Sequence, residues 1–370
     1  MRYCCQILML LALLMLSTSS AWSQDKKPVR IGLAGLSHSH SHGFLNDLQK
    51  KEYVLVGIAE SNRDLAKRYA ERYGFDLGIV YDNLDEMLDK TKPDGVLAFN
   101  SIFGHLEVVE ACAPRGIHVM VEKPFAVNGE HVRRMAELAR KHKTLLLTNY
   151  ETTWYPTNHR AYEMAVTKNS LGQLRKIVVC DGHKGPKEIR VPDEFLEWLT
   201  DPVQNGGGAV MDFGCYGANL ATWLMHNERP LSVFAVLQQF KPNVYPKVDD
   251  EATIILTYPG TQVIIQASWN WSVNRKDIEI YGATGYVKAL NATDLVWRLS
   301  EREQEQSATL ALESSLNSAP FHHFASAIRG EITIQPNDLS SLENNLIATE
   351  ILDAARKSAQ TGQHVLLPRE

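Results

Sequence analysis

Short apolar runs alternate with amphipathic stretches from Val29 to Thr148, and this rhythm constrains the fold more than any other feature of the chain. Apolar runs of strand length separated by helical patterns predict a parallel sheet with helices on both faces, a doubly wound α/β domain. A second domain is expected to follow, because 370 residues exceed one comfortable core. The expected strands are Val29–Ala34, Tyr53–Ala59, Gly95–Phe99, His118–Val121 and Thr144–Thr148, and the expected helices are Phe44–Lys51, Asp64–Tyr73, His105–Arg115 and Glu130–Lys143.

The rhythm changes after Asn149, where strand-like runs follow one another with little helix between them. Successive strands joined by turns such as Tyr258-Pro259-Gly260 indicate an α+β domain with a mostly antiparallel open sheet. Helices are expected over Asp193–Leu199 and Gly217–Met225, and an amphipathic helix over Ser340–Ala359 is expected to pack back onto the body. The expected strands of this sheet are Arg175–Cys180, Ser232–Gln239, Glu251–Tyr258, Gln262–Trp269, Asp277–Tyr281, Tyr286–Leu290 and Leu295–Leu299.

The first 23 residues have the layout of a secretory signal peptide. Arg2 supplies a positive charge, Ile7–Leu16 is an unbroken apolar run, and the small residues Ala21 and Ser23 precede Gln24. A helix of that run rises only ~15 Å, about half of the ~30 Å hydrocarbon core of a bilayer. We therefore expect cleavage near Ser23, no stable membrane anchor, and export to the periplasm or the medium. A membrane anchor or a buried first helix is the alternative.

Composition narrows the classes of partner. Lys plus Arg number 38 against 43 Asp plus Glu, so the net charge is −5, and no basic run offers a surface for nucleic acid or anionic lipid. Five cysteines in 370 residues are too few for a disulfide scaffold. Cleavage would leave Cys112, Cys180 and Cys215, which lie inside apolar patterns and are expected to be buried free thiols.

A glycine-containing loop, Gly32-Leu-Ala-Gly35-Leu-Ser37, follows the first predicted strand. Glycine at this turn lets backbone N–H groups approach a pyrophosphate at a helix N-terminus, as in Rossmann-like dinucleotide-binding folds. The G-x-G-x-x-G pattern is incomplete, because Ser37 and His40 stand where the second and third glycines are expected. Glu60 adds support, since a carboxylate at the end of the second strand binds the adenosine ribose hydroxyls, and its charge favours NAD over NADP.

Three histidines in the same loop, His38, His40 and His42, leave a second interpretation open. Alternate histidines that leave a strand can face one way and bind a metal, as in metal-dependent hydrolases. Such sites need further ligands from later strand ends, and no second H-x-H or H-x-x-E pair follows in the chain. We therefore expect the loop to pack against cofactor or substrate and to hold no metal.

Glu122-Lys123-Pro124 ends a predicted strand, so Lys123 is expected at the carboxyl edge of the first sheet, where ligands of such folds bind. A glycine-rich turn at Gly206–Gly208 precedes Asp212 and Tyr216, which are four residues apart and would share one face of a helix. A tyrosine acts as general acid or base when a nearby cation lowers its pKa, and Lys123 is the expected cation. The three residues are the candidate catalytic group.

Together the loop Gly32–Ser37, Glu60, Glu122–Pro124 and the segment Gly206–Asn219 resemble the Gfo/Idh/MocA oxidoreductase family. The resemblance implies a nicotinamide cofactor in the first domain and a sugar, a polyol or a related substrate on the sheet of the second. Many members of the family carry histidine at the position of Tyr216, and the chain with its tyrosine is similar to the branch around glucose–fructose oxidoreductase. This resemblance implies that Lys123, Asp212 and Tyr216 are the catalytic residues. The expected cofactor contacts are Gly32, Gly35, Ser37, His38, Glu60, Asn100, His105 and Glu122.

Aromatic and polar residues near strand and loop ends of the second domain are the candidate sugar contacts. Tryptophan faces stack on the C–H surfaces of sugars, while amide, imidazole and guanidinium groups bind hydroxyls or a carboxylate. The candidates are Trp154, Tyr155, Asn158, His183, Trp269, Trp271 and Arg275.

The sequence thus predicts an exported NAD(H)-dependent oxidoreductase that acts on a hydroxyl or carbonyl of a sugar or sugar derivative, as a dimer or tetramer. Free NAD is scarce outside the cytoplasm, which leaves open a redox-neutral enzyme that keeps its NAD while it oxidises, cleaves and re-reduces one glycoside. A metal-dependent hydrolase, or a sugar binder without catalysis, that uses the histidine loop is the third hypothesis. The expected boundaries are 1–23 for the signal peptide, 24–148 for the NAD-binding domain, 149–320 for the substrate and oligomerisation domain, and 321–370 for a C-terminal helical segment.

Overall fold

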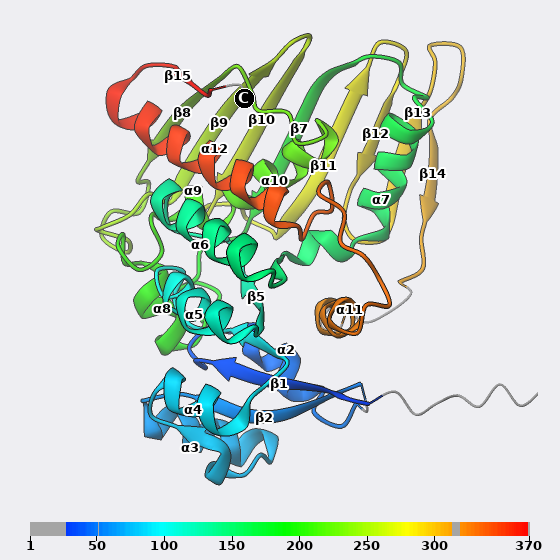
Figure 1. Ribbon diagram of the computed structural model, residues 1–370. Coiled ribbons are helices and arrows are strands. Elements are labelled where there is room, and N and C mark those ends of the chain that lie inside the picture. The colour runs from blue at the N-terminus through cyan, green and yellow to red at the C-terminus, as the bar shows by residue number, and fades with distance from the viewer. Residues whose placement is uncertain (1–26, 51, 313–318, 369–370) are drawn as a thin grey trace, which may run out of the picture.

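The computed structural model describes residues 27–50, 52–312 and 319–368 as two sheets with helices packed on them (Figure 1). The predicted signal peptide at 1–23 lies outside these residues. Within the described ranges, no helix combines the length and the apolar character needed to cross a membrane.

The first sheet has six parallel strands in the order β3-β2-β1-β4-β5-β6. The strand order reverses between β1 and β4, and ligands of doubly wound sheets bind at such a reversal, beyond the carboxyl ends of the strands. The strands are β1 (Val29–Ala34), β2 (Tyr53–Ala59), β3 (Val80–Tyr81), β4 (Gly95–Ala98), β5 (His118–Glu122) and β6 (Leu146–Asn149). The helical segments are α2 (Ser41–Asn46), α3 (Arg63–Tyr73), η1 (Leu77–Ile79), α4 (Leu84–Thr91), α5 (His105–Cys112), η2 (Ala113–Arg115) and α6 (Gly129–His142).

Two helices of this half differ from the sequence prediction. The helix expected at Phe44–Lys51 is α2, which starts at Ser41 and ends at Asn46, so it begins directly after the histidine loop. Helix α4 was not predicted, although Asn83 and Glu86 form a recognisable start signal: the Asn83 side chain accepts a hydrogen bond from the Glu86 backbone N–H.

The second sheet has nine strands in the order β14-β13-β12-β11-β7-β10-β9-β8-β15. Its pairs are antiparallel apart from β7 and β10, which run parallel. The predicted fold class, a Rossmann-like α/β domain followed by an α+β domain with a mostly antiparallel sheet, is therefore confirmed. The strands are β7 (Leu174–Gly182), β8 (Ser232–Gln238), β9 (Glu251–Tyr258), β10 (Thr261–Ser268), β11 (Arg275–Gly282), β12 (Tyr286–Ala289), β13 (Asp294–Arg298), β14 (Gln306–Thr309) and β15 (Val365–Leu366).

Helices α10 and α12 cover one face of the second sheet (Figure 1). Helix α10 approaches the sheet closely at Gly217, where a Cβ would lie 2.8 Å from Cγ1 of Ile265 on β10. A side chain at this position would push the helix away from the strands, so glycine is required. The helical segments of this half are η3 (Glu151–Trp154), α7 (Pro156–Tyr162), η4 (Glu163–Thr167), α8 (Asp193–Leu199), α9 (Ala209–Asp212), α10 (Gly214–Leu224), α11 (Ala319–Ile328) and α12 (Leu342–Thr361).

The C-terminal helices join the two halves. Helix α12 packs on α10 of the second half and on α6 of the first. Helix α11 inserts Phe321 and Phe324 into the core of the first sheet, where the Phe321 ring meets the edge of Phe44 at 5.1 Å between centroids. The core of the first sheet is thus completed by residues that come late in the chain.

Candidate active site

A buried ion pair joins the two halves of the chain. Lys123 follows β5 directly, which places it at the carboxyl edge of the first sheet, and its Nζ lies 2.5 Å from Oδ1 of Asp212 at the end of α9. The same ammonium donates to the Asp212 backbone carbonyl at 3.1 Å. Burial alone would lower the pKa of Lys123 and raise that of Asp212, but each charge outweighs that effect on its partner: the lysine pKa is raised and the aspartate pKa is lowered. Both groups therefore stay charged.

The second carboxylate oxygen of Asp212 is held by Trp269. The indole Nε1–H donates to Oδ2 at 2.9 Å, and the Trp269 side chain is completely buried. The sequence placed Trp269 among the sugar contacts, whereas the structure places its ring behind Asp212 and outside the lining of the cavity described below. Its position orients the carboxylate and gives it no contact surface for a ligand.

Tyr216 lies on α10, one turn after Asp212 and on the other side of a short break at Phe213. Two ammonium groups lie over the face of its buried ring, Lys123 at 5.2 Å and Lys276 at 4.9 Å from the ring centroid. The pKa of Tyr216 is nevertheless raised well above its ordinary value, by burial first and then by Glu151. The expected lowering by Lys123 is thus not found, because that charge is already neutralised by Asp212. Tyr216 is a neutral phenol in this structure.

These groups open into a cavity of about 390 Å³ between the two halves. Of the predicted sugar contacts, Tyr155, His183 and Arg275 line it, and Trp154, Asn158, Trp269 and Trp271 do not. The lining residues are Ser39, His40, Lys123, Glu151, Tyr155, Gly182, His183, Pro186, Ile189, Val191, Phe195, Leu199, Asp212, Phe213, Tyr216, Asn274, Arg275, Lys276, Leu290 and Asn291.

The predicted contacts outside the lining have other partners. Trp154 donates its Nε1–H to Oδ1 of Asn149 at 3.0 Å, and buried Asn158 donates to the backbone carbonyl of Thr152 at 2.9 Å. Trp271 supports the cavity indirectly, because the Arg275 guanidinium lies 4.6 Å from its ring centroid. These three side chains build the surroundings of the cavity.

Two charged cavity residues were not predicted from the sequence. They are Glu151 and Lys276, and they form an ion pair with each other. Glu151 also accepts a hydrogen bond from the Tyr155 hydroxyl at 2.5 Å. Its place two residues after β6, at the carboxyl edge of the sheet, was an available signal. Lys276 stands opposite Asp181 in the β11–β7 pair, and burial raises the pKa of Asp181 well above its usual range.

A groove of about 690 Å³ lies beside the cavity, at the strand reversal between β1 and β4. The predicted cofactor residues Gly35, Ser37, Glu60 and Asn100 line it. Groove and cavity are adjacent, because the loop after β1 and helix α8 contribute residues to both. The described part of the chain contributes no lysine or arginine to the lining of the groove. Six carboxylates line it: Glu60, Asp82, Glu107, Glu194, Glu197 and Asp201.

The groove fits a dinucleotide. Gly35 has a φ of +84°, and a Cβ there would lie 3.0 Å from the Asn100 Cβ, so glycine keeps the loop backbone close to β4. Oδ1 of Asn100 is buried without a hydrogen-bond partner among the described residues and can accept one from a ligand. Glu60 accepts hydrogen bonds from the N–H of Leu36 at 2.9 Å and of Asn62 at 2.8 Å, which ties the loop to the end of β2.

The other predicted cofactor residues do not line the groove. Gly32 lies inside β1, where a Cβ would stand 3.0 Å from Cε of Met87. His38 is buried against Phe195 and Trp198 of α8, and burial lowers its pKa well below the usual value.

His105 and Glu122 also bond within the protein. His105 is fully buried, with Nδ1 3.1 Å from the Phe125 carbonyl oxygen. Glu122 accepts a hydrogen bond from Asn149 at 2.8 Å and contacts Nδ1 of His40 at 2.7 Å. Both residues stabilise the surroundings of Lys123 from the side of the first sheet.

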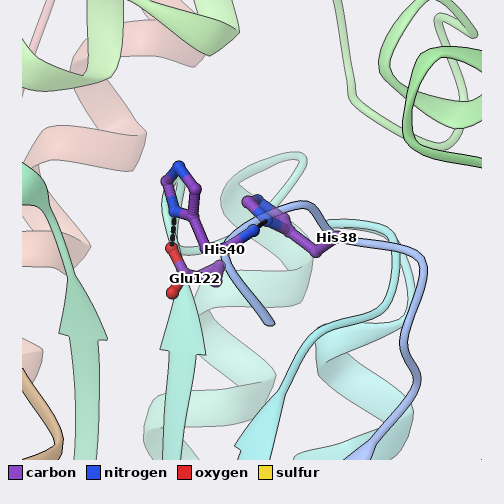
Figure 2. Close-up of side chains that lie close together, drawn as sticks. All are labelled: His38, His40 and Glu122. Carbon is purple, nitrogen blue, oxygen red and sulfur yellow. Dashed lines mark hydrogen bonds and ion pairs between the residues drawn. The ribbon is translucent and has the colours of Figure 1, made fainter. Parts of the chain in front are cut away.

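The histidine loop brings His38 and His40 together with Glu122 (Figure 2). One potential ligand atom from each lies within 4.8 Å of the others. Within the protein, Nδ1 of His38 accepts the His40 backbone N–H at 3.1 Å, and Nδ1 of His40 lies 2.7 Å from Glu122. His42 stacks on Tyr69 instead, with centroids 5.1 Å apart. The three histidines of the motif therefore do not converge on one point.

A dinucleotide groove at the strand reversal, next to a cavity with a buried lysine–aspartate pair and a tyrosine, defines an NAD-binding oxidoreductase of two domains. Family comparison agrees: residues 29–150 match the oxidoreductase family with an NAD-binding Rossmann fold, and residues 159–288 match the GFO/IDH/MocA C-terminal domain. The chain belongs to the Gfo/Idh/MocA family.

The chain is similar to dehydrogenases named for a diol and for myo-inositol. A trans-1,2-dihydrobenzene-1,2-diol dehydrogenase of Bos taurus is 26% identical over 279 residues, 73% of this chain and 77% of that protein. A myo-inositol 2-dehydrogenase of Thermotoga maritima is 23% identical over 283 residues, 75% of this chain and 80% of that protein. The crystal structure of an aldose–aldose oxidoreductase from Caulobacter crescentus, complexed with glycerol, has a TM-score of 0.77 at 22% identity, and the match covers 92% of this chain and 100% of that one.

Proposed function

We propose that the protein interconverts a secondary hydroxyl and a carbonyl of an uncharged carbohydrate, with NAD(H) as the hydride carrier. The observation that carries this proposal is the Lys123–Asp212 pair, which lies with Tyr216 in one cavity directly beside the dinucleotide groove. The relatives named for a diol and for myo-inositol support a substrate with neighbouring hydroxyls.

The chain's own residues divide the proton chemistry. NAD(H) in the groove would accept or supply the hydride. Lys123 donates a hydrogen bond to the reacting oxygen and stabilises negative charge as it develops there. Tyr216, a phenol, donates its proton to the carbonyl oxygen during reduction, and the tyrosinate that remains takes up a proton from solvent. Oxidation runs the same steps in reverse, so the substrate hydroxyl gives its proton to tyrosinate. Asp212 keeps Lys123 charged and fixes its direction.

The pairing of charges favours a neutral sugar over an acidic one. The lysines and the arginine in the cavity lining each have a carboxylate partner within the described residues: Lys123 has Asp212, Lys276 has Glu151, and Arg275 has Asp277. A carboxylate or phosphate on the substrate would have to break one of these pairs to find a positive charge. We therefore infer that recognition uses hydroxyl groups.

A panel of sugars tests this proposal. Purified protein with NAD⁺ is offered methyl β-D-glucopyranoside, myo-inositol, D-glucose and D-glucuronate, and NADH formation is followed by absorbance. We expect oxidation of at least one neutral compound and a kcat/KM for glucuronate at least tenfold below that of glucose. Absence of NADH and of any oxidised sugar, or a preference for glucuronate, would overturn it.

A redox-neutral enzyme with retained NAD is the second candidate, favoured by contacts across the groove. Helix α8 and the loop after it are fastened to the first half: Glu194 contacts Arg68 at 3.2 Å, and Ser101 donates to Oε1 of Gln204 at 2.7 Å. Glu194 and Gln204 also line the groove, so these contacts hold one of its walls in place and would favour a retained dinucleotide. The likeness to an aldose–aldose oxidoreductase is consistent with this.

Mass spectrometry of small molecules released from the denatured protein separates the two candidates. Stoichiometric NAD or NADH, together with a cleaved or reduced sugar product and no free NADH, supports retention. Cofactor-free protein that releases one NADH per oxidised sugar supports the simple dehydrogenase.

We further propose that the protein is exported after cleavage near Ser23 and assembles as a dimer or tetramer. The face of the second sheet turned away from α10 carries half-buried apolar side chains in one row across neighbouring strands, Val178, Ile264 and Ile255. Pairing of this face between copies would cover them. Light scattering on the mature protein, and N-terminal sequencing of the protein recovered outside the cytoplasm, test both points.

A further inference from the structure

One wall of the cavity is a segment, residues 182–191, that begins at the last residue of β7 and is irregular beyond it. It lines the cavity through His183, Pro186, Ile189 and Val191. Its backbone passes through positive φ at Gly182 (+155°) and Gly185 (+122°). Gly182 still pairs with both neighbouring strands, and the N–H of His183 donates to the Ser268 carbonyl oxygen at 3.1 Å. Beyond these two residues no strand ladder holds the segment, so its position depends on contacts with neighbouring loops.

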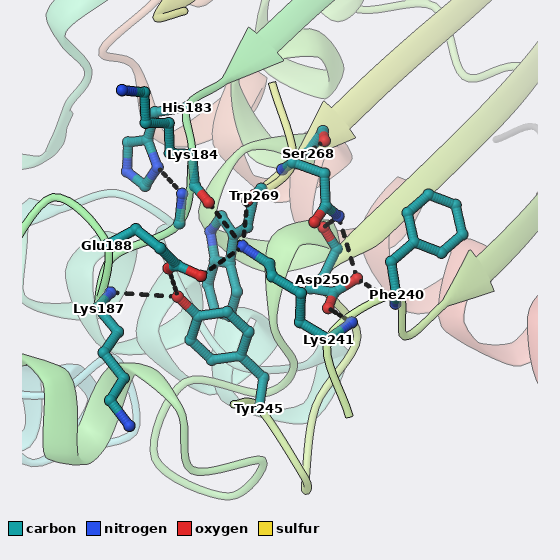
Figure 3. Close-up of polar contacts among 12 residues, drawn as sticks. His183, Lys184, Lys187, Glu188, Phe240, Lys241, Tyr245, Asp250, Ser268 and Trp269 are labelled. Carbon is teal, nitrogen blue, oxygen red and sulfur yellow. Dashed lines mark hydrogen bonds and ion pairs between the residues drawn. The ribbon is translucent and has the colours of Figure 1, made fainter. Parts of the chain in front are cut away.

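Lys241, from the loop between β8 and β9, makes two of these contacts and a third hydrogen bond to the residue that follows β10 (Figure 3). Its ammonium donates to the carbonyl oxygens of Lys184 at 2.6 Å and of Trp269 at 2.8 Å, and to Oε1 of Glu188 at 2.8 Å. An ammonium has three N–H donors, and all three are used. Lys241 therefore joins the wall segment to the end of β10.

Tyr245 completes the arrangement from the same loop. Its hydroxyl donates to Oε2 of Glu188 and accepts the backbone N–H of Lys187 at 3.1 Å (Figure 3). Glu188 is thus held through both oxygens, one by Lys241 and one by Tyr245. We call Lys241, Glu188 and Tyr245 the clasp.

The clasp is itself anchored. Asp250, which is completely buried, accepts the backbone N–H groups of Phe240 at 2.8 Å and Lys241 at 2.7 Å. A Cβ at Gly185 would stand 2.5 Å from the Tyr245 hydroxyl oxygen and 2.9 Å from Nζ of Lys241. Glycine is therefore required where the wall segment meets the clasp.

The clasp connects to the catalytic pair through one residue. Trp269 binds Lys241 with its backbone carbonyl and Asp212 with its indole N–H. On the cavity side, Nδ1 of His183 accepts the N–H of Gly185 at 2.9 Å, so the proton of the neutral ring sits on Nε2, which is left as a donor. The wall that carries this donor and the carboxylate that orients Lys123 are held at a fixed separation by Lys241.

We propose that Lys241 is a positioning residue that sets the sugar affinity of the cavity by holding the wall segment, with His183 as a hydrogen-bond donor to a sugar hydroxyl, against the Lys123–Asp212 pair. The inference rests on the proposed function for its ligand, a neutral carbohydrate. It adds a determinant of affinity that touches neither the sugar nor the cofactor.

Three variants test the proposal: Lys241→Met, Lys241→Arg and the control Lys187→Met. Lys187 lies in the same segment, but its side chain is exposed and points away from the clasp (Figure 3), so the control removes the same charge without removing a clasp hydrogen bond. Lys241 and Glu188 are themselves 24% and 32% exposed, and breaking such a pair changes global stability little, so the variants are expected to fold with melting points within about 2 °C of the parent.

Two measurements are made on the mature protein with NAD⁺. The first is kcat and KM for the neutral panel sugar that the parent oxidises. Lys241→Met is expected to raise KM about tenfold with kcat changed less than about threefold, the pattern of lost uniform binding, while Lys241→Arg keeps most of the affinity. The second is hydrogen–deuterium exchange of residues 182–191 without sugar, which is expected to be faster in Lys241→Met only.

An unchanged exchange rate of residues 182–191 in Lys241→Met, or a KM increase of equal size in Lys187→Met, overturns the proposal. An equal loss of kcat in the two Lys241 variants would also overturn it, because it would make Lys241 a general structural residue. If the parent oxidises no panel sugar, the proposed function fails, and the exchange measurement alone decides whether Lys241 holds the wall.

Discussion

Replacing Trp269 with phenylalanine isolates the hydrogen bond that orients Asp212. The substitution removes the indole N–H that lies 2.9 Å from Oδ2 but keeps the Trp269 backbone carbonyl and most of the ring packing on Tyr245. One oxygen of a buried carboxylate then loses its donor, while the other still binds Lys123. The change therefore alters the direction of the carboxylate without removing the ion pair.

The magnitude follows from the charge on the acceptor. A hydrogen bond to a charged group contributes about 1.5–3 kcal/mol, and each 1.4 kcal/mol of transition-state stabilisation is tenfold in rate. We expect kcat to fall roughly 10- to 150-fold with KM almost unchanged. The smaller ring also loses some packing, so the free energy of unfolding should fall by about 2–4 kcal/mol.

Steady-state kinetics with the best panel sugar and urea denaturation check both numbers. Trp223→Phe is the matched control, because Trp223 is another buried indole, stacked on Tyr162 at 4.1 Å and away from the cavity lining. It should lose stability and keep its kcat. A rise in KM with an unchanged kcat in the Trp269 variant would refute the reasoning, since that pattern belongs to a residue that contacts the sugar.

Three further predictions concern the tyrosine, the groove and a buried histidine. Tyr216→Phe should lower kcat by roughly 10²–10³ at unchanged NAD affinity, because it removes the proton donor; an unchanged kcat would eliminate that role. Glu60→Ala should weaken NAD binding about tenfold in a fluorescence titration and reduce the ratio of NAD affinity to NADP affinity. An equal loss of affinity for both dinucleotides would contradict a contact between Glu60 and the adenosine ribose. Burial lowers the pKa of His105 in the folded protein to about 4, whereas the same histidine in the unfolded chain binds a proton near pH 6.5. The free energy of unfolding should therefore fall by about 3 kcal/mol as the pH drops from 6.5 towards 4. Urea denaturation of His105→Gln should lack this loss between pH 6.5 and 4; an unchanged pH dependence would assign it to other groups.

Much of the fold was predictable, because strand and helix periods are local properties of the sequence. The five predicted strands of the first half are all present in the parallel sheet, whereas β3 was missed because a two-residue strand, Val80–Tyr81, has no period to detect. Strand β15 was missed for the same reason. Short edge strands depend on tertiary contacts with their neighbours.

The site was predictable where a motif marks it. Lys123 and Asp212 were identified from their local sequence context and lie together in the structure. The burial of Trp269 could have been predicted from the alternation of β10. Val263, Ile265 and Ala267 point to the core from every second position, and Trp269 is the next residue in that series. By contrast, the packing of His38 against α8 joins segments more than 150 residues apart, and no local pattern predicts it.

Helix α11 has a consequence for how the chain acquires its structure. Gly95 of β4 packs directly on Phe324 and Ile328, and a Cβ there would stand 2.8 Å from both side chains. A nascent chain that has been synthesised only as far as the first sheet therefore exposes an unfilled apolar patch until residues 319–328 emerge. The core beneath the nucleotide-binding sheet is thus completed late in biosynthesis. A chain truncated before Ala319 should be retained by chaperones even though it contains every strand of that sheet.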